Sequence, residues 1–416
     1  MSCGAFAGPK PWLLTLCLLL MAGQAFAEAD LTNETELETD SLLQLRFGPA
    51  LHADAGQEQL ASAQAGLSLK RAAGHETWRL RLQAEARHSD AGDQASVGEA
   101  YLAHQQGRWS WRLGRQRFEW AITDTVSPSD LLNARDWRDL SRPQKLARTA
   151  FSLRQDSGDS SLEWVLAPRA APSELPAGVW AQPLPPGLSQ APVDAGNSRW
   201  TTALRWSARL DEQEFSLVAF HGQSYAPMAS LAAAADGRGW LLQPRQDGMD
   251  ALSLGLTRPL WSGSLLRAEA ALLNHQRSQR FAQWVISIDH ERFAPFAADD
   301  SLYLLLQLQG ERLIGERRDA PAGWWDFRRV FANSLMTRLQ YKPGEQSRWQ
   351  WALEANWRPR QGGTASEHFA RMSLTRQLGE GLQLELSATS IGGPPASFWG
   401  SYARQDRLSL ALQWRR

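Results

Sequence analysis

The sequence predicts an all-β protein, a single closed antiparallel β-barrel that crosses a membrane with about eighteen strands. Three observations predict this fold class. The chain begins with an export signal, apolar and polar side chains alternate along most of it, and short connections alternate with long ones. The alternating segments have the length of a tilted membrane-crossing strand, about nine to eleven residues.

Residues 1–27 are predicted to be a secretory signal peptide. Lys10 precedes an apolar run from Trp12 to Met21, and Ala25-Phe26-Ala27 forms an A-x-A cleavage site. The apolar run is shorter than the roughly 20 residues of a membrane-spanning helix. Residues 28–416 are then expected to form one barrel domain.

The composition excludes several classes of function. Both cysteines, Cys3 and Cys17, lie in the signal peptide, so the mature chain is expected to have no disulfide and no thiol chemistry. The 44 basic and 44 acidic residues balance, which speaks against a nucleic-acid partner. Twenty tryptophans suit a surface that faces lipid, where such rings gather at the membrane interfaces.

Period-two alternation defines the strands in order along the chain. In the third segment, for example, Trp78, Leu80 and Leu82 alternate with Arg79 and Arg81. The predicted strands are 42–48, 61–71, 76–88, 97–106, 108–118, 147–156, 160–168, 199–210, 213–223, 250–258, 264–273, 283–290, 301–309, 330–341, 347–358, 367–377, 382–390 and 404–414. A count of about sixteen stays open, because the connection 291–300 is long for its side.

The connections predict which side of the membrane each end faces. Short turns such as 72–75 and 211–212 alternate with long loops such as 119–146 and 169–198. Short periplasmic turns and long extracellular loops are typical of barrels in the outer membrane of Gram-negative bacteria. The alternative is a soluble β-sandwich, in which the same alternation places leucine and tryptophan in a core and arginine in solvent.

Two further predictions concern the long loops. Loop 169–198 contains prolines at 172, 176, 183, 185, 186 and 192, and is predicted to remain unpaired. A short helical piece is predicted at 231–235.

A hairpin and its following loop carry a family resemblance. Their motifs are Glu99-Ala100-Tyr101-Leu102, Leu113-Gly114-Arg115-Gln116, Trp120, Asp124, Pro128, Asp130-Leu131 and Asn133. This stretch resembles outer-membrane barrels of the alginate-export type and related proteobacterial barrel families. The resemblance implies a transport barrel and leaves its cargo open.

If tryptophan and leucine face lipid, the opposite face lines a lumen rich in arginine. The candidate pore-lining residues are Arg79, Arg81, Arg87, Arg112, Gln116, Arg148, Arg154, Arg205, Arg348 and Arg371. About fifteen arginines fall on this face against about seven glutamates. An arginine excess in a water-filled channel favours anions, whereas salt bridges with the lumen acids would only stiffen the wall.

Loop 119–146 is the candidate constriction. Its charged residues are Glu119, Asp124, Asp130, Arg135, Asp136, Arg138 and Asp139. Folded into the lumen, these carboxylates would meet wall arginines. Left outside, the loop would simply be solvated.

The sequence therefore predicts a porin-like channel that passes or exports a polar, anionic solute or polysaccharide. The alternative is a non-conducting structural or adhesion barrel whose loops bind a partner. No catalytic motif, metal site or cofactor site is predicted. The expected partners are outer-membrane lipid and the solute, and export partners in the periplasm are left open. A monomer and a trimer are both compatible with the sequence.

Overall fold

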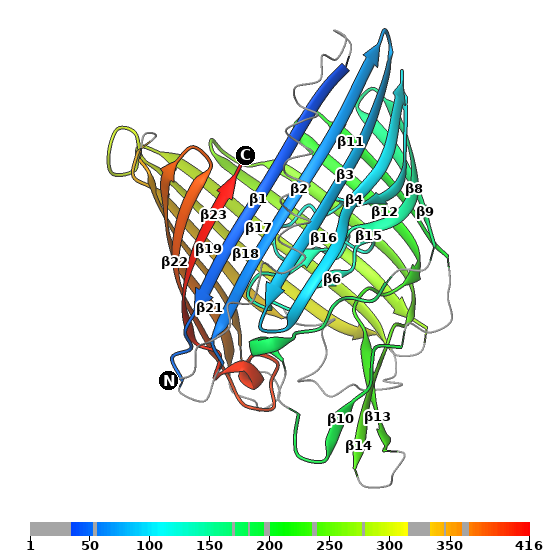
Figure 1. Ribbon diagram of the computed structural model, residues 1–416. Helices are drawn as coiled ribbons and strands as arrows, with labels where there is room; N and C mark the ends of the chain where they lie inside the picture. Colours follow the sequence, from blue (N-terminus) through cyan, green and yellow to red (C-terminus); the bar gives the residue numbers. More distant parts are fainter. Residues whose placement is uncertain are drawn as a thin grey trace, which may run out of the picture.

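The computed structural model describes residues 35–52, 56–168, 171–181, 184–194, 200–234, 239–276, 279–314, 333–344, 347–359 and 366–416. The predicted signal peptide, residues 1–27, lies outside them. The described strands form an 18-stranded antiparallel sheet that closes on itself. Closure occurs because the first strand, β1 (Thr35–Gly48), pairs with the last, β23 (Arg407–Arg415) (Figure 1).

The remaining barrel strands each pair with their neighbours in chain order. They are β2 (Glu58–Ala73), β3 (Glu76–Ser89), β4 (Gly92–Gln106), β5 (Trp109–Gln116), β8 (Arg148–Ser157), β9 (Ser160–Ala167), β11 (Thr201–Leu210), β12 (Gln213–Gln223), β15 (Gly248–Pro259), β16 (Ser264–His275), β17 (Arg280–Phe293), β18 (Ser301–Ile314), β19 (Ser334–Lys342), β20 (Trp349–Arg358), β21 (Glu367–Gly379) and β22 (Leu382–Gly392). Each predicted strand coincides with one of these eighteen. The prediction of a barrel is confirmed, and the alternative count of sixteen is wrong.

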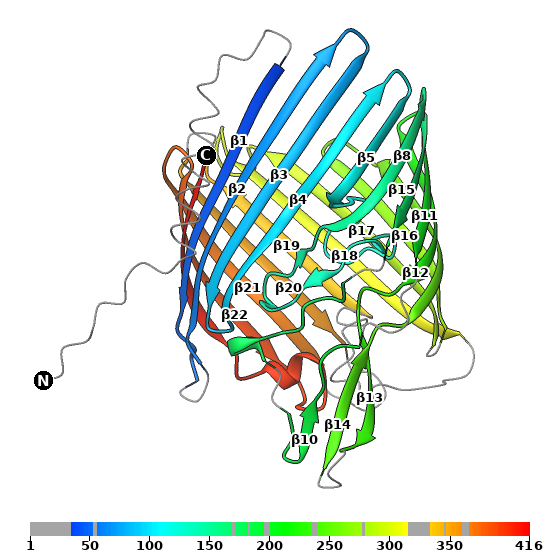
Figure 2. The same cartoon turned by 45° about the vertical axis from the view of Figure 1, so that its right-hand side comes forward.

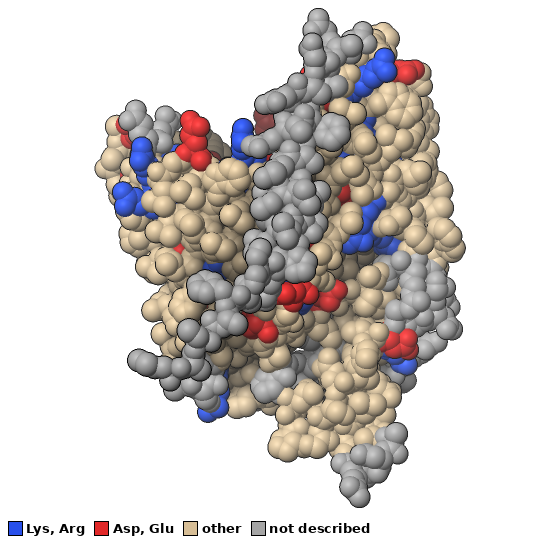
Figure 3. Space-filling view, in the orientation of Figure 1, with Lys and Arg blue, Asp and Glu red and all other residues tan. Residues whose placement is uncertain are grey.

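The two faces of the sheet differ as the alternation predicts. In β1, Leu43, Leu45 and Phe47 are exposed on the outer face, whereas Arg46 between them is buried inside. Apolar side chains therefore face outward, and the outer wall in Figure 3 carries few charged residues. A soluble sandwich would bury these side chains, so the exposed apolar face identifies a lipid-facing wall.

Aromatic rings gather on the outer wall near the short turns. Trp78 of β3 lies 4.1 Å from the His104 ring of β4 and 5.8 Å from the Trp111 ring of β5, measured between centroids. Rings of this kind mark the membrane interface.

Short and long connections lie at opposite ends of the barrel (Figures 1 and 2). One end carries the short turns 74–75, 107–108, 158–159, 211–212, 260–263, 294–300, 343–348 and 380–381. The strand ends on the opposite side are separated in the sequence by 49–57, 90–91, 117–147, 168–200, 224–247, 276–279, 315–333, 359–366 and 393–406. Connections 90–91 and 276–279 are the two short ones at the long-loop end.

The long loops have small elements of their own. Strand β6 (Arg135–Asp136) pairs with β7 (Gln144–Lys145), and β14 (Trp240–Arg245) pairs with β10 (Leu188–Gln190) and β13 (Met228–Ala233). Two 3₁₀ turns, η1 (Gly178–Trp180) and η3 (Trp399–Tyr402), complete them. Among the described residues, no helix is long and apolar enough to span a membrane.

Two loop predictions are wrong. The proline-rich loop does pair, through β10, because the three residues of that strand contain no proline and keep their backbone N–H groups. The expected helical piece at 231–235 is instead part of strand β13, because it pairs with β14; residue 235 lies outside the described residues.

The lipid-facing assignment predicts a position-dependent effect of charge. Leu254 lies in the middle of β15 and is 58% exposed on the outer face. Leu254→Arg should lower the free energy of unfolding in lipid vesicles by about 2–4 kcal/mol, because the charge enters hydrocarbon. Urea titration followed by tryptophan fluorescence measures it.

The matched control is Gln64→Arg on the inner face of β2, opposite Glu85 of β3. This arginine should cost little, because it faces water and an acid. Equal losses in the two variants would contradict the assignment of the faces.

Candidate functional site

The loop 117–147, called the inner loop below, leaves the wall after β5 and crosses the inside of the barrel. Trp120 Nε1 donates to Glu163 of β9 at 2.9 Å. Further along, Arg338 of β19 donates to Asp124 at 2.7 Å. The inner loop thus spans from β5 to strands on the far side of the lumen.

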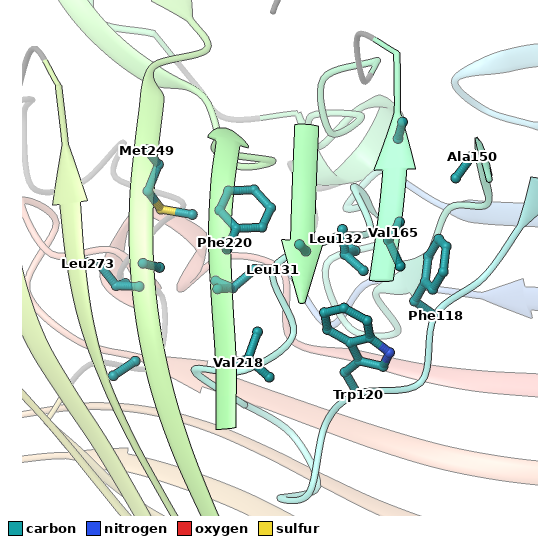
Figure 4. Packing of buried hydrophobic residues seen from close by; sticks show 14 of the residues in the cluster. Phe118, Trp120, Leu131, Leu132, Ala150, Val165, Val218, Phe220, Met249 and Leu273 are labelled. Carbon is teal, nitrogen blue, oxygen red and sulfur yellow. The ribbon is translucent and has the colours of Figure 1, made fainter. Parts of the chain in front are cut away.

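Apolar residues of the inner loop pack against the inner wall. Phe118, Trp120, Leu131 and Leu132 are almost fully buried. They form one cluster with wall residues that include Ala150, Val165, Val218, Phe220, Met249 and Leu273 (Figure 4). Because these wall residues sit on inward positions of β8, β9, β12, β15 and β16, this part of the lumen is a packed core rather than a water channel.

A polar contact fixes the point where the inner loop turns inward. The Asn133 side chain accepts a hydrogen bond from the Phe118 backbone N–H at 3.3 Å and donates one to the Phe118 carbonyl at 2.7 Å. These bonds replace the strand pairing that Phe118 loses at the end of β5, which satisfies both of its buried backbone groups.

The far end of the inner loop is anchored by ion pairs where the barrel closes. The Asp139 carboxylate contacts Arg46 of β1, which also donates to Glu58 of β2 at 3.1 Å. Arg142 contacts Glu385 of β22. The loop therefore bridges the first two strands of the barrel and one of the last.

The pKa values at this anchor follow from burial and neighbouring charge. Burial by itself would raise the pKa of Asp139, but Arg46, with help from Ser141 and Arg142, holds that pKa at about 2. Burial, together with the positive charges of Arg46 and Arg371, lowers the pKa of Arg142 to about 10. Both side chains therefore stay charged at neutral pH.

Two more carboxylates organise the middle of the inner loop. Asp136 accepts hydrogen bonds from Arg138 at 2.9 Å and from Arg87 of β3 at 3.2 Å. Asp130 pairs with Arg135 at 2.5 Å and with Lys145 at 3.4 Å. Burial raises the pKa of Asp130 despite these two cations.

The remaining charged residue of the predicted constriction loop lies elsewhere. Glu119 is mostly exposed, and among the described residues it pairs with Lys145 alone, at 2.5 Å. The structure thus brings the seven predicted residues into the barrel or to its rim. Whether they constrict a passage stays a prediction.

The other long loops pack with the inner loop into a second apolar cluster. Its members are Trp137, Leu140, Trp180, Ala226, Ala229, Leu242, Phe369, Ile391, Phe398, Trp399 and Tyr402. They come from the inner loop, from 168–200, from 224–247, from 393–406 and from the wall. The cluster lies beside the last strands of the barrel, because Phe369 and Ile391 belong to β21 and β22 and Arg407 of β23 lies over the Trp180 ring, 4.6 Å from its centroid.

Most of the predicted pore-lining residues lie on the inner face and are neutralised there. Ion pairs join Arg81 to Asp40, Arg87 to Asp136, Arg112 to Glu163, Arg154 to Asp156 and Arg371 to Glu385. Gln116 is fully buried and donates to the Ala150 carbonyl at 3.0 Å. Arg148 donates to the Leu132 and Pro168 carbonyls, and no described acid pairs with its charge.

Three predicted pore-lining arginines have no side-chain hydrogen bond or ion pair among the described residues: Arg79, Arg205 and Arg348. Arg79 lies on β3 near Glu36. Arg348 lies just before β20 and is exposed at the short-turn rim, so it is not part of a barrel strand.

The count of inward arginines against inward glutamates in the sequence left out most of the acids that neutralise these arginines. Asp40, Glu58, Asp156 and Asp289 face inward and pair with arginines of the wall. The inner loop adds Asp124, Asp136 and Asp139. The expected arginine excess therefore shrinks to a few side chains, a result that required the register of β1, β2 and β17.

The unpaired Arg205 lies beside a recess on the short-turn side of the inner loop. The recess has a volume of about 340 Å³, and its lining includes Ile122, Arg154, Asp156, Asp159, Ser161, Arg205, Ser207, Arg209, Glu214 and Ser216. Arg154 and Arg209 are paired with acids, but the Nε of Arg205 is buried without a partner, and so is the Ser216 hydroxyl. A buried donor without a partner favours an acceptor that enters the recess.

Removing the Asp139 charge should release the inner loop. Asp139→Asn leaves Arg46 with one acid instead of two, and breaking a buried ion pair costs about 3–5 kcal/mol. We expect trypsin to cleave after Lys145 of this loop at least roughly tenfold faster than in the unaltered protein. Asp156→Asn, at a half-exposed pair, is the control and should leave the cleavage rate within about twofold.

The depressed pKa of Asp139 also predicts the pH dependence of the loop. Because this pKa is lower in the folded protein (about 2) than in an unfolded chain (about 3.9), the ionised carboxylate stabilises the docked loop above pH 4. That stability should be lost as the pH falls from about 4 to about 2. Hydrogen exchange of the loop amides across this range measures it. An identical profile in Asp139→Asn would contradict the assignment.

Comparisons with known proteins agree with the barrel. No family model and no curated protein matches the chain. Solved outer-membrane porins of Pseudomonas aeruginosa do match in structure. OccK3 (OpdO) has 10% identity and a TM-score of 0.55, covering 92% of this chain and 96% of that one. OccD3 (OpdP) has 11% identity and a TM-score of 0.53, covering 91% of each chain.

A third porin, OccK2 (OpdF), was solved in complex with glucuronate. It has 14% identity and a TM-score of 0.51, covering 91% of this chain and 98% of that one. At these identities the matches show a shared fold, that of an outer-membrane porin-like barrel. They do not support the narrower resemblance to alginate-export barrels.

Proposed function

We propose that the protein is a porin-like channel in the outer membrane of a Gram-negative bacterium, passing a small, polar, anionic solute. The observation that carries this proposal is the recess beside Arg205. It presents a guanidinium without an acidic partner together with serine hydroxyls, on the inner face of a closed barrel. Guanidinium groups bind carboxylates and phosphates through paired hydrogen bonds.

We infer the size of the solute from the position of the inner loop. This segment crosses the lumen and packs against β9, β16 and β19 as well as the closing strands. A passage beside such a loop suits a small solute better than the polysaccharide that the sequence left open. The selectivity of a pore follows from its width and from the charges on its wall.

The anion preference rests on few groups. Most lumen arginines are neutralised by acids within the wall or the inner loop, so the field in the lumen depends on Arg79, Arg148 and Arg205. Of these three, only Arg205 borders the recess, whose lining also holds as many acids as arginines. The attraction for an anionic group there therefore rests on the buried Arg205 Nε that lacks an acceptor, and not on a net positive charge of the recess.

A second candidate function is a non-conducting barrel whose extracellular loops bind a partner. The observation that favours it is the apolar cluster of long loops, with Trp180, Trp399 and Tyr402 almost fully buried. If these loops do not move apart, the packed cluster would block the lumen and the barrel would not conduct. The same conductance experiment separates the two functions.

In planar bilayers, the unaltered protein should conduct with a preference for chloride over potassium. Arg205→Gln should lower the permeability ratio by about twofold or more and weaken any block by glucuronate, because the unpaired charge is lost. Arg258→Gln, on the outer face of β15 near the same end, is the matched control and should change neither quantity. An absence of conductance would favour the second candidate, and cation selectivity would contradict the anion proposal.

A further inference from the structure

The barrel wall has a break on its long-loop half, next to the point where the inner loop departs. Strand β4 pairs with β3 from Gly92 onward, but it pairs with β5 only from Ala100 onward. Residues 92–99 therefore have no strand on their second side among the described residues. Every residue from Gly92 to Val97 is exposed.

Arg115 stands at the edge of this break, on the lipid-facing side of the wall. It shares the outward face of β5 with Trp109, Trp111 and Leu113. In register it lies opposite Ala100, which lies opposite Leu82 of β3. Along the wall, Arg115 therefore lies between the ring cluster of Trp78, near the short turns, and the long-loop end of β3 and β4.

An arginine at such a position is costly in lipid and calls for partners. Two partners are the carbonyls of Val97 and Gly98 on the free edge of β4, to which the Arg115 Nε donates at 2.7 Å and 3.0 Å. These bonds satisfy edge carbonyls that no strand reaches. They leave the two terminal nitrogens of the guanidinium without a partner among the described residues.

Arg117 adds a second positive charge at the same place. It follows Arg115 by two residues and lies close enough to repel its guanidinium. The Nε of Arg117 is buried without a hydrogen-bond partner. Its backbone N–H donates to Glu99 at 2.9 Å, but that carboxylate also acts on Arg81, on the lumen side.

Neither guanidinium forms an ion pair with a described acid. Arg115 on the lipid-facing side and Arg117 beside it are two adjacent cations, which an anion supplied by lipid would stabilise. A phosphate oxygen can accept from several N–H groups at once, and arginine binds phosphate in a paired, planar geometry.

We propose that Arg115 and Arg117 bind the phosphate group of a lipid in the leaflet on the long-loop side, seated at the break beside β4. The placement in the outer leaflet rests on the proposed function. The site itself is separate from the lumen, and its test does not depend on conductance.

The experiment uses the full chain, purified in detergent and titrated with lipid A or with chemically dephosphorylated lipid A, with bound lipid counted by native mass spectrometry. The unaltered protein should bind lipid A at least roughly tenfold more tightly than the dephosphorylated form, because charge-assisted hydrogen bonds are lost with the phosphates. Arg115→Gln/Arg117→Gln should abolish this preference. Arg258→Gln, another outward arginine, should retain it.

Arg117→Gln alone serves if the double variant fails to fold, because it keeps the Arg115 bonds to Val97 and Gly98. It should lower the preference by several-fold while the barrel keeps its heat-dependent gel mobility. The proposal is overturned if the unaltered protein shows no preference, or if the arginine variants keep it in full. It is also overturned if inorganic phosphate at equal concentration displaces lipid A, because the site would then bind free phosphate.

Discussion

The closing of the sheet between β1 and β23 is the constraint on which the rest of the structure depends. A strand edge in hydrocarbon leaves backbone groups unpaired at a cost of several kcal/mol each, so nearly all of the wall is paired on both sides. The break at residues 92–99 is the exception, and there Arg115 donates to two of the edge carbonyls. The antiparallel register from Leu42–Arg415 to Phe47–Leu410 provides this closure. Once the sheet is closed, every strand has one face toward lipid and one toward the lumen.

The inner loop is an insertion between two neighbouring strands of the wall, β5 and β8. The chain leaves the sheet after Gln116 and returns at Arg148, and both residues still pair with each other. Between them, apolar residues fill the lumen, and carboxylates reach the arginines of the wall. The loop therefore stabilises the region where the barrel closes, through Asp139 and Arg46, while it narrows the interior.

Charge in the lumen is nearly balanced, and function rests on the exceptions. A paired arginine stiffens the wall and contributes little field, whereas an unpaired one attracts an anion. Arg205 is such an exception inside the barrel, and Arg115 with Arg117 is another on its outer surface. Both were present in the sequence, but only their surroundings distinguish them from the paired arginines. Arg81 and Arg205, for example, belong to the same alternating pattern.

The sequence by itself predicted the barrel, a count of about eighteen strands with sixteen still open, and the face that most side chains of the strands occupy. The reason is that alternation is a local property of each strand and that lipid on one side makes the register of faces unambiguous. Tertiary structure decided which charges neutralise one another, because Asp139 meets Arg46 across 93 positions of the chain. It also decided the path of the inner loop, since Trp120, Leu131 and Asn133 find their partners only after the wall has closed around them. No local pattern encodes such distant contacts, and for that reason the sequence could place the arginines on the inner face but could not say which of them stay unpaired.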